Sequence, residues 1–321
     1  MDEILQQIGA FGLVPMIKID QAKDAVPLAK ALSDGGLPVA EITFRTAAAE
    51  EAIRNIASAL PEVLIGAGTV TNVAQAEKAV KAGAKYIVTP GFSAAVVKFC
   101  VDNKIPVTPG IATPTEIQMA LDHGVDTVKF FPADAFGGLK TLKAMSAPYS
   151  MVKFIPTGGI SAANLAEYIL FPKVLACGGS WLAKDELIKA GQFGEITRIT
   201  REAVDLVLGF AVGHVGLNMP DAGASLDLAR RMADLFRMPL KEGNSSNFAG
   251  AGLEINKSQG LGAHGHIAVS TNSIARAVAF LRRRGVAINM ESARQDAAGN
   301  LAAVYLEDEF GGFAVHLLQR K

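Results

Sequence analysis

A lysine and a glutamate stand in two short apolar segments where they could act on a carbonyl group together. In AEITFR, alternation with a period of two puts Glu41 and Arg45 on one face of a strand, and in TVKFFP it puts Lys129 beside Phe131. Apolar surroundings favour the neutral amine, which attacks a ketone to form an imine, and a nearby carboxylate can carry protons. A purely structural Lys129–Glu41 ion pair is the alternative, because structural networks also bury lysines.

Two glycine pairs predict a phosphate site beside this pair of residues. They occur in Thr157-Gly158-Gly159 and in Gly178-Gly179-Ser180, each after an apolar segment. Glycine lets backbone N–H groups approach a phosphate closely, although a single pair is also ordinary turn chemistry. Two pairs on consecutive segments favour the phosphate interpretation.

Three further residues are assigned by their place in a segment. Lys18 comes late in the first segment, where it could lie near the mouth of the fold and contact an anionic substrate; a lysine that is only solvated at the strand end is the alternative. Thr69 adds a hydroxyl group at the end of the third segment. Lys153 begins its segment and is expected at the opposite end, away from the chemistry.

Eight β-branched segments, with starts 20 to 26 residues apart, must position these side chains. They are VPMIKI (from 14), VAEITF (39), LIGAG (64), YIVTP (86), VTPG (107), TVKFF (127), KFIPT (153) and VLACGG (174). Helical patterns such as EIQMALDHG lie between them. Eight consecutive βα units predict an α/β fold, a (β/α)₈ TIM barrel over residues 1–209, with Glu41 and Lys129 facing each other across its axis.

The βα pattern stops after Gly209, and residues 210–321 are expected to form a smaller α+β domain. Two similar passages there, HVGL from His214 and HIAV from His266, predict paired βαβββ units. His214 and His266 occupy equivalent first strands, and Glu254 and His316 lie on the last strand of each half. These four residues could hold Zn²⁺, Ni²⁺, Mn²⁺ or Fe²⁺.

The amino-acid composition limits the kinds of partner that the sequence predicts. Thirty-one basic residues balance 31 acidic ones and half of the chain is apolar, so nothing predicts binding to nucleic acid or to a membrane. The first residues lack the pattern of a secretion signal, which favours a cytoplasmic protein. Cys100 and Cys177 are expected to be buried, reduced thiols.

Six sequence blocks in the first 209 residues resemble the 2-keto-3-deoxy-6-phosphogluconate (KDPG) and 4-hydroxy-2-oxoglutarate (KHG) aldolases. The blocks are EITFR (41–45), GAGTV (66–70), TPGIATPTE (108–116), KFFP (129–132), PTGGI (156–160) and GGSWL (178–182). They occur in the order of the family and span nearly the whole predicted barrel. The resemblance implies a class I lyase without a cofactor, and it suggests a homotrimer.

The resemblance also implies a role for each matched residue. Lys129 would form the imine with the pyruvyl carbonyl, and Glu41 would move protons, through a water molecule. Arg45 and Thr69 would hold the pyruvyl carboxylate, with Arg45 also orienting Glu41. The other matched residues would line the pocket (Pro90 and Phe131) or take the substrate phosphate (Thr157, Gly158, Gly159, Gly179 and Ser180). Lys18 departs from the family, in which arginine is common at this position, and so lacks a bidentate fork.

Residues 212–318 resemble the glyoxalase and vicinal-oxygen-chelate superfamily, through less specific segments. These are HVGLN (214–218), HGHIAVSTNSIARAVAFL (264–281) and GGFAVHLL (311–318). The resemblance implies metal ligands at His214, Glu254, His266 and His316, although glutamate is common at the last of these positions. A domain that only binds a partner or holds subunits together is the alternative.

The sequence therefore predicts a lyase that acts on small 2-keto acids. It would cleave KDPG to pyruvate and glyceraldehyde 3-phosphate, KHG to pyruvate and glyoxylate, or both. A 6-phosphogalactonate-type aldolase, a phosphate-binding isomerase or synthase without covalent catalysis, and a non-enzymatic sugar-phosphate binder are the alternatives. The last two would leave Lys129 unexplained.

Overall fold

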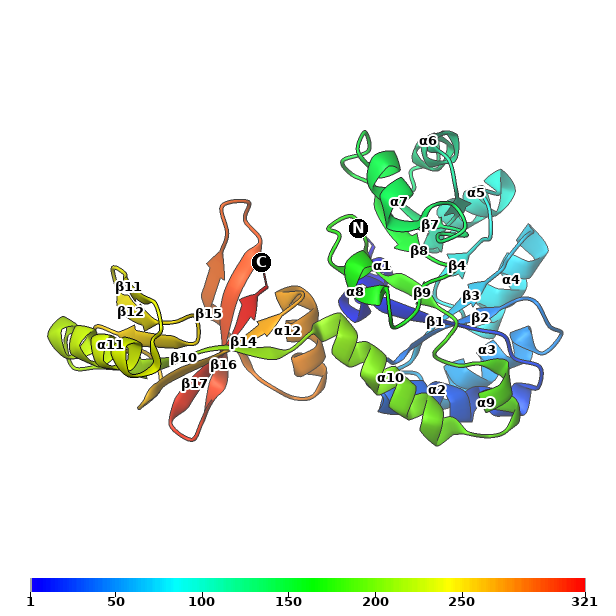
Figure 1. Ribbon diagram of the computed structural model, residues 1–321. Helices are drawn as coiled ribbons and strands as arrows, with labels where there is room; N and C mark the ends of the chain where they lie inside the picture. The colour runs from blue at the N-terminus through cyan, green and yellow to red at the C-terminus, as the bar shows by residue number, and fades with distance from the viewer. Residues whose placement is uncertain (1, 321) are drawn as a thin grey trace. The chain divides into compact units, whose positions relative to one another are not determined.

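The computed structural model describes residues 2–320, which divide into two compact units. The first unit ends at Val207 and the second begins at Leu208. The predicted boundary between residues 209 and 210 lies two residues further along the chain. Figure 1 shows strands alternating with helices in the first unit and one large sheet in the second.

Short parallel strands form the interior of the first unit. They are β1 (Leu13–Ile17), β2 (Val39–Thr43), β3 (Leu64–Gly68), β4 (Ile87–Val88), β5 (Val107–Thr108), β6 (Gly110–Ile111), β7 (Thr127–Phe130), β8 (Lys153–Pro156) and β9 (Cys177–Gly179). Their hydrogen bonds give a six-stranded sheet, β5-β4-β3-β2-β1-β9, and a three-stranded sheet, β6-β7-β8. Parallel bridges also join Phe154 to Val174 and Thr157 to Gly178. The first unit is thus an α/β fold with a curved parallel sheet.

Every one of the eight predicted segments contains a strand, and the fifth contains two. Pro109 separates β5 from β6, because proline has no N–H group to donate to a ladder. The fourth segment keeps only Ile87 and Val88 as strand, and the eighth begins its strand at Cys177. The sequence pattern located the strands but overestimated their lengths.

Helices lie outside these strands (Figure 1). They are α1 (Glu3–Phe11), η1 (Ala22–Asp24), α2 (Ala25–Asp34), α3 (Ala49–Ala59), α4 (Val73–Ala82), α5 (Ala94–Asp102), α6 (Pro114–Asp122), α7 (Gly138–Ser146), α8 (Leu165–Ile169), α9 (Asp185–Lys189) and α10 (Phe193–Leu208). Local sequence sets their ends: Thr113 and Glu116 form a capping box with Pro114 at the first turn of α6. Gly83 ends α4 in the left-handed conformation that favours glycine.

The core of the first unit lies on both faces of its strands. All five residues of β2 are buried, with apolar Ala40 and Ile42 alternating with Glu41 and Thr43. Thr43 Oγ1 donates a hydrogen bond to the carbonyl oxygen of Ile17, 2.9 Å away. A polar face is therefore built into a strand that is closed to solvent.

The second unit is an eight-stranded sheet with two helices, α11 (Ala222–Phe236) and α12 (Ile274–Arg283). Its strands are β10 (Ala211–Asn218), β11 (Leu240–Glu242), β12 (Ser246–Ala249), β13 (Leu253–Asn256), β14 (Gly265–Thr271), β15 (Ile288–Gln295), β16 (Leu301–Phe310) and β17 (Phe313–Gln319). Their order is β11-β12-β13-β10-β14-β17-β16-β15. The same pairings occur on each side of the β10–β14 pair: a parallel first and last strand, followed outward by two antiparallel strands.

Alternation gives this sheet one apolar and one polar face. Val304 and Leu317 are buried on strands that contact α12, and Ile255 is buried on a strand that contacts α11. Glu254 and His316 are sequence neighbours of two of these residues, so they point away from the helices. The face opposite the helices carries the chemistry-bearing side chains.

No helix among residues 2–320 has the length and apolarity needed to cross a membrane. Both cysteines are buried thiols, as predicted, and burial raises the pKa of the Cys100 thiol to about 12. Cys100 is therefore a packing residue at neutral pH.

Candidate active site and candidate metal centre

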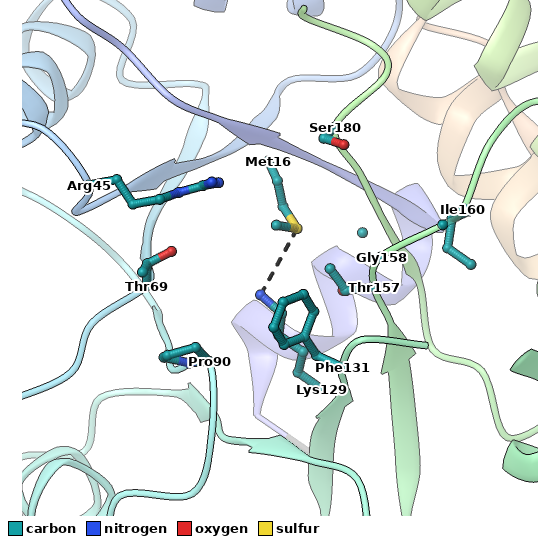
Figure 2. A pocket seen from close by; sticks show the side chains of 12 residues that line it. Met16, Arg45, Thr69, Pro90, Lys129, Phe131, Thr157, Gly158, Ile160 and Ser180 are labelled. Carbon is teal, nitrogen blue, oxygen red and sulfur yellow. Dashed lines mark hydrogen bonds between the residues drawn. The ribbon is translucent and has the colours of Figure 1, made fainter. Parts of the chain in front are cut away.

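A cavity of about 350 Å³ lies where the strands of the first unit end (Figure 2). Its lining residues are Met16, Arg45, Thr69, Pro90, Lys129, Phe131, Thr157, Gly158, Gly159, Ile160, Gly178 and Ser180. Carboxyl ends of parallel strands are where barrel-type folds place their chemistry. The cavity thus gathers residues from distant parts of the sequence around one amine.

Lys129 lines this cavity and meets Glu41 behind the lining, as strand alternation predicted. Lys129 Nζ lies 3.5 Å from Glu41 Oε1, and the two side chains are only 4% and 5% exposed. The same amine is 4.0 Å from Met16 Sδ and 5.3 Å from the centre of the Phe131 ring (Figure 2). Among the described residues, Glu41 Oε1 has no hydrogen-bond partner. The carboxylate can therefore exchange a proton with a ligand held at the amine.

Gly68 makes room for the glutamate. A Cβ atom at this position would lie 2.0 Å from Glu41 Oε1, far inside van der Waals contact. Gly68 is paired with Thr43 on the neighbouring strand, so its backbone cannot easily move away. The GAGT block thus has a steric function that its sequence alone does not reveal.

A second, much smaller cavity adjoins the Lys129–Glu41 pair. It measures about 10 Å³, enough for about one water molecule, and Tyr86 and Thr108 line it with the pair. Burial, followed by the Glu41 charge, raises the pKa of Tyr86 well above its usual value. Its neutral hydroxyl group donates to the Ala40 carbonyl oxygen at 3.1 Å.

The predicted carboxylate and phosphate residues lie around the mouth of the large cavity. Arg45, Thr69 and Pro90 lie on one side, and Gly158 and Ser180 lie on the other side of Lys129 (Figure 2). The described residues contain no Arg45–Glu41 ion pair, so the expected orienting contact is not present.

The glycine loop after β8 has a backbone conformation that favours glycine at two positions. Gly158 and Gly159 have φ angles of 92° and 81°, a conformation that side chains rarely adopt. A Cβ atom on Gly159 would also lie 2.1 Å from Asp134 Cβ. Both residues therefore need to be glycine.

Two predicted binding residues lie outside the cavity lining, and both placements have a physical reason. Lys18 forms ion pairs with Asp20 at 2.8 Å and with Asp185 at 3.2 Å, so its charge is compensated here and its contact with an anionic substrate stays a prediction. Gly179 faces the Trp181 ring, whereas Gly178 lines the cavity beside Thr157.

Met16 and Ile160 line the cavity but were not predicted to do so. Met16 could have been predicted, because it lies two residues after Val14 and therefore on the same, inward face of β1. Ile160 follows the glycine loop, where no periodic pattern applies.

The four residues predicted as metal ligands come together in the second unit. His214 Nε2 lies 3.0 Å from Glu254 Oε2 and 3.1 Å from His266 Nε2, and His266 Nε2 lies 3.4 Å from the same carboxylate oxygen. One nitrogen from each of His214, His266 and His316 falls within a 4.8 Å group. Gly216 allows this approach, because a Cβ there would lie 2.1 Å from His266 Cε1.

The electrostatics of this cluster fit a cation. Both ring nitrogens of His316 are buried without a hydrogen-bond partner among the described residues. Burial, followed by the nearby His266 and His214 charges, lowers the pKa of His316 to about 4. Hydrogen bonds with His214 and His266 hold the Glu254 pKa far below its usual value, and Ser246 Oγ donates to Glu254 Oε1 at 2.6 Å. Neutral imidazoles and an oriented carboxylate are suitable transition-metal ligands.

Comparison with known proteins concerns the first unit. The family model for KDPG and KHG aldolase matches residues 3–199. The 2-dehydro-3-deoxy-phosphogluconate aldolase of Treponema pallidum is 45% identical over 207 residues, which cover 64% of this chain and 99% of that protein. The KHG/KDPG aldolase of Escherichia coli K12 is 45% identical over 193 residues, covering 60% of this chain and 91% of that protein.

Solved structures agree with this similarity. A KDPG aldolase of Legionella pneumophila, with pyruvate captured as a covalent carbinolamine intermediate, is 39% identical with a TM-score of 0.60 over 62% of this chain and 97% of that one. The Zymomonas mobilis 2-keto-3-deoxy-6-phosphogluconate aldolase with 3-phosphoglycerate is 37% identical with a TM-score of 0.59, covering 63% of this chain and 95% of that one. These relatives are lyases, and the cavity described above lies within the matched residues. This chain belongs to the KDPG and KHG aldolase family.

Proposed function

We propose that the first unit is a class I aldolase in which Lys129 forms an imine with the keto group of KDPG, of KHG, or of both. The observation that carries this proposal is the buried Lys129–Glu41 pair, whose lysine lines a cavity of about 350 Å³. The pyruvate adduct captured in the Legionella relative supports imine chemistry.

The reaction follows from the positions of these two groups. Lys129 Nζ attacks the C2 carbonyl and water leaves, giving a protonated imine that withdraws electrons from the C3–C4 bond. Glu41 accepts the proton of the C4 hydroxyl group, the C3–C4 bond breaks, and its electron pair forms an enamine while the aldehyde departs. Glu41 then returns a proton to C3, and water hydrolyses the imine to release pyruvate and the free lysine.

Two groups of residues would hold the ends of the substrate. Arg45 and Thr69 would bind the pyruvyl carboxylate, with Pro90 and Phe131 as apolar walls. On the opposite side, the backbone N–H groups of the glycine loop and the Ser180 hydroxyl would take a phosphate. The phosphate site favours KDPG or its galactonate epimer over KHG, whose aldehyde product, glyoxylate, lacks a phosphate.

Borohydride reduction tests the imine directly. Pyruvate should label the wild-type chain stoichiometrically, and Lys129→Ala should abolish the label. Lys153→Ala is the matched control, because that lysine begins β8 and its amine donates to the Pro172 carbonyl oxygen at 3.0 Å. Full labelling of Lys129→Ala would refute the assignment and favour a non-covalent isomerase, synthase or binding protein.

We also propose the finer architecture that the sequence predicted, a closed (β/α)₈ barrel followed by paired βαβββ units. The bridges from Phe154 to Val174 and from Thr157 to Gly178 support closure between β8 and β9. The repeated pairing around β10 and β14 supports a duplicated unit. Family membership supports a homotrimer, which sedimentation equilibrium can test.

We further propose that His214, Glu254, His266 and His316 hold a divalent transition-metal ion. The convergence of their donor atoms carries this proposal. Such an ion would supply Lewis-acid polarisation of a bound oxygen. Metal analysis of the full chain should give one ion per chain, lost in His316→Ala but kept in His264→Ala, whose ring packs on Phe313 outside the cluster. A metal-free wild-type chain would refute the proposal.

A further inference from the structure

A methionine side chain lies beside the reactive amine of the first unit. Four of the five residues of β1 are buried, whereas Met16 is partly exposed, and Figure 2 shows its side chain pointing toward Lys129. Met16 Sδ lies 4.0 Å from Lys129 Nζ. Met16 is also the register partner of Glu41 across the parallel β1–β2 pair. The thioether and the Glu41 carboxylate therefore flank the same amine.

The cavity gives small polar molecules access to this sulfur atom. Met16 lines it together with the polar side chains of Arg45, Thr69 and Ser180, and its volume of about 350 Å³ is far larger than a single water molecule needs. Among the described residues that line the cavity, only Met16 contains sulfur. A solute as small as hydrogen peroxide can therefore reach Met16 Sδ.

The two cysteines are poorly placed to react with such an oxidant before Met16 does. Cys100 and Cys177 are both fully buried. Thiol oxidation proceeds through the thiolate, and the raised pKa of Cys100 keeps that thiol protonated at neutral pH. A thioether needs no deprotonation before it takes up an oxygen atom. Met16 is thus the oxidisable group that lies within the active-site cavity.

The position of Lys129 suits the proton transfers of this reaction. Met16 Sδ attacks one oxygen of hydrogen peroxide, the O–O bond breaks, and a hydroxide ion departs. The protonated amine, 4.0 Å from the sulfur, donates a proton to the hydroxide and then takes one back from the new S–OH group. The sulfur is oxidised, the peroxide is reduced, and the products are a sulfoxide and one water molecule.

We propose that Met16 is an oxidative modification site, at which a peroxide converts the thioether to a sulfoxide that stops imine formation at Lys129. The inference rests on the proposed function of Lys129. The sulfoxide oxygen accepts a hydrogen bond from the ammonium group, which favours the protonated amine that cannot attack a ketone. It also places a polar group where the substrate carbonyl must approach Lys129 Nζ.

Exposure of the full chain to hydrogen peroxide tests this proposal. After graded exposures, catalase removes the peroxide, because peroxide decarboxylates 2-oxo acids such as pyruvate. Peptide mass spectrometry then measures the fraction of chains that carry one extra oxygen atom on Met16. Borohydride trapping of radiolabelled pyruvate measures the fraction that still forms the imine. The labelled fraction should fall in step with the rise of the Met16 sulfoxide.

Two variants separate this site from other methionines. Met16→Leu keeps the approximate volume of the side chain without its sulfur, so each exposure should leave its label at the value measured before treatment. Met119→Leu is the matched control, because Met119 is 39% exposed on α6 and lies outside the cavity lining. Met119→Leu should lose its label as wild type does.

Full labelling of chains that carry the Met16 sulfoxide would overturn the proposal. So would an unmodified Met16 in chains that have lost the label, or a loss of label in Met16→Leu as fast as in wild type. A wild-type chain that takes no label before treatment would instead refute the imine at Lys129, and this inference with it.

Discussion

Substituting Gly68 by alanine should disable the first unit without touching a reacting group. The new Cβ would lie 2.0 Å from Glu41 Oε1 and 2.6 Å from Cδ, whereas ordinary contacts begin near 3.4 Å. The carboxylate must therefore retreat by about 3.4 − 2.0 = 1.4 Å. Because Gly68 is held in the β2–β3 ladder, the side chain rather than the backbone should give way.

This displacement is large compared with what proton transfer tolerates. Glu41 Oε1 now stands 3.5 Å from the Lys129 amine, and a misplacement of about 1 Å can cost roughly 10²-fold in rate. General acid–base catalysis contributes about 10²- to 10⁴-fold in total. We therefore expect kcat for pyruvate release to fall by about 10²- to 10³-fold, or roughly 3–4 kcal/mol of barrier.

The assay must separate lost proton transfer from lost folding. Pyruvate release is followed with lactate dehydrogenase and NADH, and imine formation is followed separately by borohydride trapping. Gly68→Ala should still trap pyruvate on Lys129, with a stability loss of about 1–3 kcal/mol from overpacking. Gly194→Ala is the matched control, because a Cβ there meets no atom within 4 Å. A Gly68→Ala enzyme with wild-type kcat would show that the carboxylate position does not limit the reaction.

Three further perturbations test other parts of the two sites. Ser180→Ala should raise KM about tenfold for a phosphorylated substrate, because one hydrogen bond to a charged group is lost, and it should leave KM for KHG unchanged. An equal rise in KM for the two substrates would contradict a role of Ser180 in phosphate binding. Ser246→Ala should weaken metal binding about tenfold in a competition titration, because Glu254 loses the donor that orients it; unchanged affinity would make that contact incidental. The folded-state pKa of His316, about 4, lies below its ordinary 6.5, so the unfolded chain binds more protons between these values. The free energy of unfolding of the metal-free second unit should therefore rise as the pH increases from 4 to 6.5, by at most about 1.4 kcal/mol per pH unit. His316→Phe should flatten the dependence of the melting temperature on pH. An equally steep dependence in the variant would show that His316 does not cause it.

Strand alternation predicted the part of the first site that lies on regular strands. Glu41 and Lys129 were assigned to inward faces because a period of two leaves no intermediate orientation, and the structure joins them at 3.5 Å. The ion pair of Lys18 with Asp185 could not be predicted in this way, because the two residues lie 167 positions apart in the sequence. Charge compensation by tertiary contacts is the information that alternation lacks.

The second unit shows the same limit more sharply. The convergence of its four predicted ligands could be anticipated, because the repeat in the sequence places them on equivalent strands. The orientation of Arg294 could not be predicted in this way, since the register of β15 shifts on both sides of it, between Asn289 and Arg294 and between Arg294 and Gln295. A shift of one residue moves every later side chain to the other face, so only the folded register shows which face Arg294 occupies.

The two clusters resolve the cost of buried charge in different ways, and this difference determines what each can bind. In the first unit Lys129 lies against Glu41, and among residues 2–320 Glu41 Oε1 has no hydrogen-bond partner, which suits proton transfer to and from a bound ligand. In the second unit the donor atoms of three imidazoles and a carboxylate lie close together, and within the same range neither ring nitrogen of His316 has a hydrogen-bond partner. Converging acceptors repel one another unless a cation lies between them, which is why the proposed metal centre of the second unit should bind a divalent ion.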